Sequence, residues 1–573
     1  MREQLWAVRR RVSTAMLRPS YLFCLLLLLP LAAADLVESY RTEIAPILQD
    51  LCGDCHSGRK SKGGITFEGL TDELALRQDR ERWRRVREAL EFQQMPPAKE
   101  TQPETAERER IIAWIRSEIE SPDPNNPLFL DPGPNMLRQL SREEYKRSVQ
   151  DLLGLGGQDP ASQAGIPHHR PPEGFSNLAG GMTIDPGVLE KYFHAAEIAL
   201  ERLLNEGRER DRIFFVKPDN TAGISPDDAA SQVLERVVPR AYRRPVEPGE
   251  WQRLLPLFRA AFAAGDDYQL ALTKAMKPVL SSPNFLYRIE KQRPPQTPGQ
   301  RYRRVSDHEL AVRLSYFFWS TAPDRELRNA ADKGELSNPE QLRSQVARLI
   351  ADGKARALTE NFSVQWLRLR KLDRALPQQN KFPSYDGDLK RAMHDEVFSF
   401  LENLRKENRS LLELIDSDYT FVNEKLAGHY GIPGITGKKM QRVALLPTHH
   451  RGGLLGMAGL LTATSHTDRT KPTARGTWIL DVLFGTPPSP PPEDAGTLEE
   501  SKDKSDAPEP QTFRERLAQH ASDSSCAACH KKMDPLGFAL ENYNAIGAWR
   551  ESFGDLPVDS QGTLPTGETF RGV

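Results

Sequence analysis

The strongest constraint on this chain is a short cysteine–histidine motif that occurs near both ends of the sequence. Residues 52–56 read Cys-Gly-Asp-Cys-His, and residues 526–530 read Cys-Ala-Ala-Cys-His. This spacing is typical of covalent attachment of a c-type haem, because two thiols one helical turn apart can each add to a porphyrin vinyl group. The adjacent imidazole then reaches the iron from one face. We therefore predict two haem c groups, attached through Cys52, Cys55, Cys526 and Cys529, with His56 and His530 as iron ligands.

The cysteine count favours haem over the other uses of such a motif, a zinc site or a redox dithiol. The chain has five cysteines, and all except Cys24, which lies in a segment expected to be removed, belong to the two motifs. No cysteine is then left for a disulfide. A zinc site would need two distant pairs to converge on one metal, and it would leave the histidine that closes each motif unexplained.

The first 34 residues have the pattern of a secretory signal peptide. Five arginines precede an apolar run over residues 21–31, and Ala32-Ala33-Ala34 forms a cleavage pattern before Asp35. The run is short for a transmembrane helix, although an uncleaved N-terminal anchor remains an alternative. We expect a protein exported to the periplasm or cell envelope, with no membrane span after cleavage. Export agrees with the haem prediction, since c-type haem is attached outside the bacterial cytoplasm.

Composition excludes some classes of partner. The chain has 573 residues, of which 38% are hydrophobic and 27% charged, as in an ordinary globular protein with several domains. Its 78 Lys and Arg residues balance 79 Asp and Glu residues, so the net charge does not indicate nucleic acid or an acidic polymer as a partner. Redox partner proteins are expected instead, and the oligomeric state is left open.

The first motif is expected at the end of a helix in a cytochrome c-like module over residues 36–120. Further helices are predicted near 79–92 and 105–120. Met95 follows the first of these and precedes two prolines, which keep the backbone extended so that the thioether can point inward. We predict Met95 as the sixth iron ligand, with core packing as the alternative. The helix that carries the motif has an apolar face formed by Ile44, Ile47, Leu48 and Leu51.

The middle of the chain is predicted to be a multi-helix body, because apolar residues recur at helical spacing and strand patterns are few. Capping boxes of the form Ser-x-x-Glu begin at Ser141 and Ser306. We interpret His394-Asp395-Glu396 as the solvated face of an amphipathic helix rather than as a catalytic group. Predicted helices fall near residues 187–205, 228–240, 248–263, 267–279, 339–352, 354–370, 388–405 and 421–428.

A tether is predicted before the second motif. Residues 487–492 form a stiff polyproline spacer, and the charged tract that follows has too few apolar residues to pack. The residues after the linker, which include Cys526–His530, are called the second haem segment. The linker over residues 487–512 leaves open whether this segment docks on the helical body or swings.

The sixth ligand of the second iron has several candidates. Met533 lies only three residues after His530, too near to reach the opposite face of the iron easily, and is interpreted as a packing residue. Met457, His466 and His450 all precede the linker. We favour Met457, whose thioether suits a high-potential site, over a bis-histidine site, and an open or water-ligated iron remains an alternative.

The predicted fold class is mainly α, with an N-terminal cytochrome c-like module, a multi-helix central body and a tethered C-terminal haem segment. The predicted domain boundaries are a signal peptide 1–34, the cytochrome c-like domain 36–120, helical domains 135–205, 225–292 and 303–432, and the C-terminal segment 440–573.

Motifs along nearly the whole mature chain carry a resemblance to a known family. They are the Cys52–Met95 module, residues 140–145, 151–154, 241–245, 282–287, 313–319, 418–421 and 429–431, and the Cys526–Arg550 segment. In this order they resemble the large exported multidomain cytochromes of planctomycetes and related bacteria, in which a planctomycete-type cytochrome c domain precedes domains of unknown function. Members usually continue past the position of Val573, so we expect a shortened member. Lys471-Pro472 stands where serine-proline is usual.

Three classes of function are compatible with the motifs. We favour an exported dihaem c-type cytochrome that carries electrons in the cell envelope. The alternatives are a haem-dependent oxidoreductase acting on a small molecule, a peroxide or a carbohydrate, and a structural envelope protein. The resemblance implies no settled activity, and the sequence has no serine nucleophile elbow, zinc-protease helix or phosphate-binding glycine loop.

Overall fold

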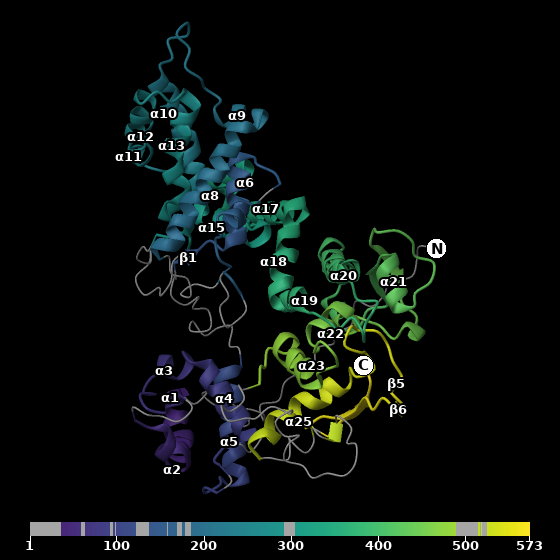
Figure 1. The fold of residues 1–573 in the computed structure, drawn as a ribbon. Coiled ribbons are helices and arrows are strands. Elements are labelled where there is room, and N and C mark those ends of the chain that lie inside the picture. The colour runs from purple at the N-terminus through teal and green to yellow at the C-terminus, as the bar shows by residue number, and fades with distance from the viewer. Residues whose placement is uncertain are drawn as a thin grey trace, which may run out of the picture. The chain divides into compact units, whose positions relative to one another are not determined.

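A computed structural model describes most of the chain between residues 36 and 573 (Figure 1). The described residues are 36–58, 64–91, 95–97, 99–121, 137–157, 159–168, 175–177, 185–291, 304–488, 514–515, 517, 524–565 and 567–573. The predicted signal peptide and nearly all of the predicted linker lie outside them. The chain divides into two compact units, Met1–Asp131 (unit 1) and Pro132–Val573 (unit 2). The described residues are mainly α-helical, which confirms the predicted fold class.

Unit 1 is a small helical unit, and the helix with the first motif belongs to its core. Trp83 and Trp114 lie at its centre, with ring centroids 5.3 Å apart, and Tyr40 contacts both rings. The indole nitrogens are satisfied, since Trp83 donates to the Leu76 carbonyl and Trp114 donates to the Ser39 hydroxyl. The elements are α1 (Leu36–Ser39), η1 (Tyr40–Ile44), α2 (Ala45–His56), α3 (Glu73–Arg77), α4 (Arg80–Glu91), α5 (Thr105–Trp114) and η3 (Ile115–Glu120).

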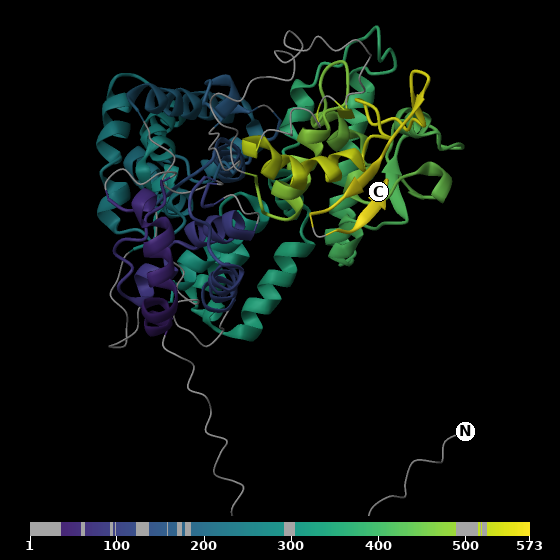
Figure 2. The same cartoon turned by 90° about the horizontal axis from the view of Figure 1, so that it is seen from below.

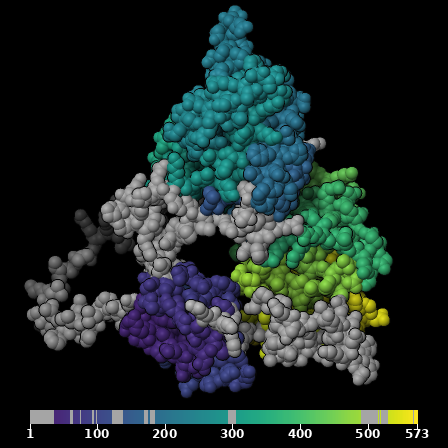
Figure 3. Space-filling view, turned by 60° about the vertical axis from the view of Figure 1, so that its left-hand side comes forward, coloured from purple at the N-terminus to yellow at the C-terminus, as the bar shows by residue number. Residues whose placement is uncertain are grey.

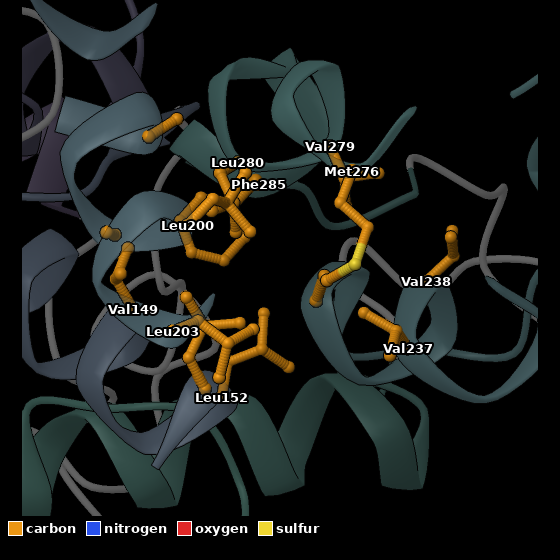
Figure 4. Close-up of a cluster of buried hydrophobic side chains, with 14 of the residues drawn as sticks. Val149, Leu152, Leu200, Leu203, Val237, Val238, Met276, Val279, Leu280 and Phe285 are labelled. Atoms are coloured by element: carbon orange, nitrogen blue, oxygen red, sulfur yellow. The ribbon is translucent and has the colours of Figure 1, made fainter. Parts of the chain in front are cut away.

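Unit 2 begins with a helical bundle that is closed by a pair of two-residue strands. Its core is formed by aliphatic and aromatic side chains from several helices, among them Val149, Leu200, Val237, Met276 and Phe285 (Figure 4). The predicted capping box at its start is present, because the Ser141 hydroxyl accepts from Glu144 N and the Glu144 carboxylate accepts from Ser141 N. The elements are β1 (Arg138–Gln139), α6 (Arg142–Leu153), α7 (Pro160–Gln163), α8 (Pro186–Asn205), α9 (Gly207–Ile213), α10 (Pro226–Tyr242), α11 (Pro248–Gln252), α12 (Leu255–Ala263), α13 (Tyr268–Ser281), α14 (Pro283–Leu286) and β2 (Tyr287–Arg288).

A second group of helices follows and contacts this bundle. The second predicted capping box, between Ser306 and Glu309, opens its first helix. Ion pairs Arg147–Glu360 and Lys354–Asp151 link the two groups. Figure 3 shows the surface of the chain, with colours that run from blue through teal to green over these residues. The elements are α15 (Asp307–Trp319), α16 (Arg325–Asp332), η4 (Glu335–Ser337), α17 (Pro339–Ala351), η5 (Gly353–Ala355), α18 (Arg356–Trp366) and α19 (Arg370–Arg374).

The last part of unit 2 shares one core between the long helix α20 and the segments on either side of the predicted linker. Its elements are α20 (Gly387–Lys406), η6 (Leu411–Leu414), β3 (Tyr419–Val422), α21 (Glu424–Tyr430), β4 (Gln441–Ala444), η7 (Pro447–His449), η8 (Leu454–Gly456), α22 (Ala458–Ala463), α23 (Pro472–Trp478), η9 (Ile479–Leu483), α25 (Ser524–Phe538), β5 (Ser552–Phe553), β6 (Leu556–Pro557), β7 (Gln561–Thr563) and β8 (Thr569–Arg571). The strands form two-stranded antiparallel pairs, β3 with β4, β5 with β6 and β7 with β8.

The helix predicted near 421–428 is wrong at its start. Residues 419–422 form strand β3, and the helix begins only at Glu424 after Asn423, whose side chain accepts from Leu426 N. The sequence Tyr-Thr-Phe-Val is rich in aromatic and β-branched residues, which favour a strand. Within the described ranges, no helix has the length and apolar character that crossing a membrane requires.

Candidate haem-binding sites

The first motif occupies the C-terminal end of α2, which presents its histidine beside a backbone carbonyl. His56 Nδ1 lies 3.2 Å from the Ile65 carbonyl oxygen, and the ring of Phe67 packs edge-on at 5.9 Å. A carbonyl can only accept, so this contact places the ring proton on Nδ1 and leaves the Nε2 lone pair for a metal. Metal-binding histidines are commonly oriented in this way by a carbonyl or a carboxylate.

The two thiols of the first motif are half-buried. Cys52 packs at the edge of the unit 1 core, and Cys55 lies one turn further along α2. Burial, with a smaller contribution from the Cys55 thiol, raises the pKa of Cys52 to about 11. Cys52 is therefore a neutral thiol at pH 7.

The predicted sixth ligand of the first iron, Met95, lies on the surface of unit 1. Its side chain is 43% exposed, and its backbone N–H donates to the Ala89 carbonyl at 3.3 Å. The Gln102 amide donates to the carbonyls of Pro96 and Pro97, which fixes the chain just after the methionine. The side chain of Met95 is therefore not packed in the core, which was the alternative interpretation of this residue. The assignment of Met95 to the iron stays a prediction.

The second motif lies inside helix α25, and its histidine is oriented by a carboxylate. His530 Nδ1 is 2.8 Å from Asp534 Oδ2, one helical turn further on. Both side chains are largely buried, with 12% and 10% exposed. Cys529 is half-buried, whereas the side chain of Cys526 lies outside the described residues. Asp534 was not predicted as a partner of His530, although the i, i+4 spacing of the two residues on a helix was a usable signal.

Helix α25 packs directly against α23, although the predicted linker separates them in sequence (Figure 1 and Figure 2). Two glycines allow this approach. A Cβ atom at Gly476 would lie 1.8 Å from the Met533 carbonyl oxygen, and one at Gly537 would lie 2.0 Å from the Pro472 carbonyl oxygen. Thr477 Oγ1 also lies 3.3 Å from the Met533 sulfur, in accord with the packing role expected for Met533. The second haem segment is therefore docked on the helical body.

A fully buried arginine fixes the loop that follows α25. Arg475, which is 1% exposed, donates through Nη1 to the carbonyls of Leu540 and Tyr543, and through Nη2 to the carbonyl of Asn544. Glu541 lies 3.4 Å away and balances its charge. Burial lowers the pKa of Arg475 to about 10, which still leaves the guanidinium charged at neutral pH.

Arg451 makes a second attachment to the same loop. It donates to the Gly547 carbonyl at 2.6 Å, and its guanidinium lies 3.7 Å from the ring centroid of Tyr430 and 5.2 Å from that of Tyr543. His429 Nε2 adds a contact of 2.8 Å to the Ile546 carbonyl. Burial lowers the pKa of His429 to about 4, so this imidazole is neutral and donates.

The candidate sixth ligands of the second iron lie in different surroundings. Met457 is 1% exposed and belongs to the hydrophobic core that also contains Leu540 and Ile546. His450 is exposed and stacks on Trp549, with ring centroids 4.0 Å apart. His466 lines a small surface pocket beside α19 and α22. Met457 thus has a packing role of its own, and its assignment to the iron stays a prediction.

The interpretation of Glu396 as part of a solvated helix face is wrong. Glu396 is 1% exposed, because it lies three residues after Met393 and four before Phe400 on the buried face of α20. Its carboxylate accepts hydrogen bonds from Thr420 Oγ1 at 2.7 Å and from the Tyr430 hydroxyl at 2.6 Å. Burial raises the pKa of Glu396 to about 7, against the lowering effect of these two hydrogen bonds.

The residues around both motifs fit a haem c group. Each motif is helical, and each motif histidine has its Nδ1 atom beside an acceptor. Among the described residues, which do not include the Cys526 side chain, no group of three or more His, Cys, Asp or Glu side chains is arranged to hold a metal ion by itself. A haem iron needs no such group, since the porphyrin supplies four of its ligands.

Comparison with protein families places four consecutive matches in unit 2. They are PSD3 over residues 138–205, PSD5 over 229–290, PSD4 over 305–432 and PSCyt3 over 451–553, which are described as proteins of unknown function DUF1587, DUF1595, DUF1592 and DUF1588. The four matches follow one another along the chain without overlap, which is consistent with a multidomain family. The second motif lies within the PSCyt3 match. No match was found among curated proteins or among solved structures.

Proposed function

We propose that this chain is an exported dihaem c-type cytochrome that transfers electrons in the cell envelope. The observation that carries the proposal is shared by the two motifs. Each places two cysteines one helical turn apart and follows them with a histidine whose Nδ1 atom lies beside an acceptor. A redox dithiol requires no oriented imidazole, whereas an axial haem ligand does. The name of the PSCyt3 family supports the same cofactor.

In this proposal the chain binds and orients two irons, and a bound haem c supplies one-electron chemistry. Cys52 and Cys55 attach one porphyrin and Cys526 and Cys529 the other. His56 and His530 hold the irons, with Met95 and Met457 as the proposed sixth ligands.

The proposed location and partners follow from the same cofactor. The apolar N-terminal segment supports export, and redox proteins of the cell envelope are the proposed donors and acceptors. The balanced charge of the chain does not favour a polyanionic partner.

Reversible redox titration of the full chain tests electron transfer. The proposal expects two one-electron steps, and replacing the two cysteines of either motif by alanine should remove one step and leave the other. Cys24→Ala is the matched control, because this cysteine belongs to neither motif. A chain whose absorbance shows no reversible step after addition of reductant and oxidant would contradict the proposal.

A further inference from the structure

We infer that Asp534 is a positioning residue that lowers the reduction potential of the iron bound through His530. The inference rests on the proposed attachment of haem to the second motif. It concerns a property that the motif alone does not define, since Cys-x-x-Cys-His says nothing about the group behind the imidazole.

The geometry of the pair is that of a charged hydrogen bond held on one helix face. Asp534 Oδ2 lies 2.8 Å from His530 Nδ1, and the two residues are four positions apart on α25. Because an iron would occupy Nε2, the Nδ1 atom carries the proton and donates it toward the carboxylate. Hydrogen bonds to a charged acceptor are shorter and stronger than those to a neutral one.

Among the described residues, the interaction observed for the Asp534 carboxylate is the one with His530. Its Oδ1 atom is buried and makes no hydrogen bond to any of the described residues. Arg475, the buried cation of α23, is engaged by Glu541 and by backbone carbonyls. The His530 imidazole is thus the hydrogen-bond partner seen for this carboxylate in the described part of the chain.

The first motif provides an internal comparison. There the Nδ1 atom of His56 lies 3.2 Å from the Ile65 carbonyl, a neutral and more distant acceptor. The two attachment motifs are therefore alike in sequence but differ in the charge behind the histidine. The structure assigns a more electron-rich imidazole to the second motif than to the first.

An electron-rich imidazole stabilises the oxidised iron more than the reduced iron, because the oxidised iron carries one more positive charge. Hydrogen bonding behind a ligand is one of the means by which a protein tunes its metal. Asp534→Asn is nearly isosteric, and its amide oxygen can still accept from Nδ1, so the variant removes the charge while keeping the hydrogen bond. Asp534→Ala removes both.

The experiment is a redox titration of the full chain in a Cys52→Ala, Cys55→Ala background, so that the second haem is observed alone. At a fixed applied potential, Asp534→Asn should raise the ratio of reduced to oxidised iron at least tenfold, which is about 59 mV upward for one electron. Asp534→Ala should raise the ratio at least as much. Asp534→Glu, which keeps a carboxylate, should stay within threefold of the parent. Glu551→Gln removes a charge from an exposed position and should also stay within threefold.

The outcomes separate this inference from the proposal on which it rests. If the parent carries one haem per chain and the potentials of Asp534→Asn and Asp534→Ala equal that of Glu551→Gln, Asp534 does not tune the iron. The haem proposal would remain intact. A parent with no haem in the second motif would contradict the haem proposal itself, and a pyridine haemochrome assay reports this separately. Circular dichroism verifies that each variant is folded. If Asp534→Asn is not folded, the potential of Asp534→Ala tests the role of Asp534.

Discussion

Arg475 Nη1 donates to the carbonyl oxygen of Tyr543 at 2.8 Å, across a gap of 68 residues in sequence. The same buried guanidinium also binds the carbonyls of Leu540 and Asn544. The loop behind the second motif is therefore fixed to α23, and the second haem segment shares the core of unit 2. The predicted linker joins two segments that are already packed together.

Arg475→Met should weaken the attachment of the second haem segment. The change leaves the buried carbonyls of Leu540, Tyr543 and Asn544 without their donor, and each unsatisfied buried group costs about 1–3 kcal/mol of the free energy of unfolding. Glu541 keeps Arg550 as a partner at 3.1 Å. Hydrogen–deuterium exchange should rise over residues 524–550, as measured by mass spectrometry. Arg391→Met, on the exposed face of α20, is the matched control. Equal exchange in both variants would show that Arg475 does not hold the segment.

Gly476→Ala and Gly537→Ala should each push α23 and α25 apart. The new methyl group would overlap a backbone carbonyl of the facing helix, and overpacking of this kind costs about 1–3 kcal/mol. Gly428→Ala in α21 is a control with the opposite expected sign, since no atom lies within 4 Å of the new Cβ. It should stabilise the helix by about 0.5–1 kcal/mol. Chemical denaturation distinguishes the two cases, and a stabilising Gly476→Ala would contradict the observed packing.

Glu396 should make the stability of unit 2 depend on pH. Its pKa is about 7 in the folded chain and near its ordinary value of 4.5 when unfolded, so the folded state binds more protons between these values. The free energy of unfolding should therefore fall as pH rises from about 4.5 to about 7, and this contribution should be flat above that range. Glu396 can change the free energy of unfolding by at most about 3 kcal/mol over this range, since a pKa difference of one corresponds to about 1.36 kcal/mol.

Glu396→Gln should remove this dependence and gain stability over the parent as pH rises to 8. The glutamine amide can donate to the Thr420 hydroxyl while its oxygen accepts from Tyr430, so the buried hydrogen bonds are kept. Asp388→Asn, at an exposed position of the same helix, is the control and should leave the pH profile unchanged. A parent and a Glu396→Gln variant with parallel profiles would show that Glu396 does not titrate in this range.

Met95→Ala tests the sixth ligand of the first haem. Loss of the thioether should remove the iron–sulfur absorption band of one haem and lower its potential substantially, because axial ligands move haem potentials over about 0.8 V. Met440→Ala, a half-buried methionine of unit 2, is the control. Spectra that are identical in the parent and in Met95→Ala would assign Met95 no role at the iron.

Local patterns in the sequence predicted the helices well, because their signals lie within a few residues. The capping boxes at Ser141 and Ser306 and the apolar face of α2 are of this kind. The strand over residues 419–422 was missed because its apolar residues also fit one turn of a helix. Burial of Glu396 was missed because a glutamate is expected on the exposed face of a helix. The sequence does not show that Thr420 and Tyr430 donate hydrogen bonds to its carboxylate in the core.

The candidate sites were predictable in part. The attachment residues are defined by the motif itself, whereas the group behind each histidine is not. Ile65 acts through its backbone, which leaves no signal in the sequence, and Asp534 is one carboxylate among many. Docking of α25 depends on Gly476 and Gly537, 61 positions apart, and only the folded chain brings them to the same interface.

The haem content of the exported full chain tests the proposal most directly. The chain is expressed with a c-type haem attachment system, and haem per chain is measured by pyridine haemochrome absorbance together with intact protein mass. We predict two covalently bound haems, and one after Cys52→Ala with Cys55→Ala or after Cys526→Ala with Cys529→Ala. A parent that carries one haem or none, or that binds zinc in stoichiometric amount, would contradict the assignment of a dihaem cytochrome.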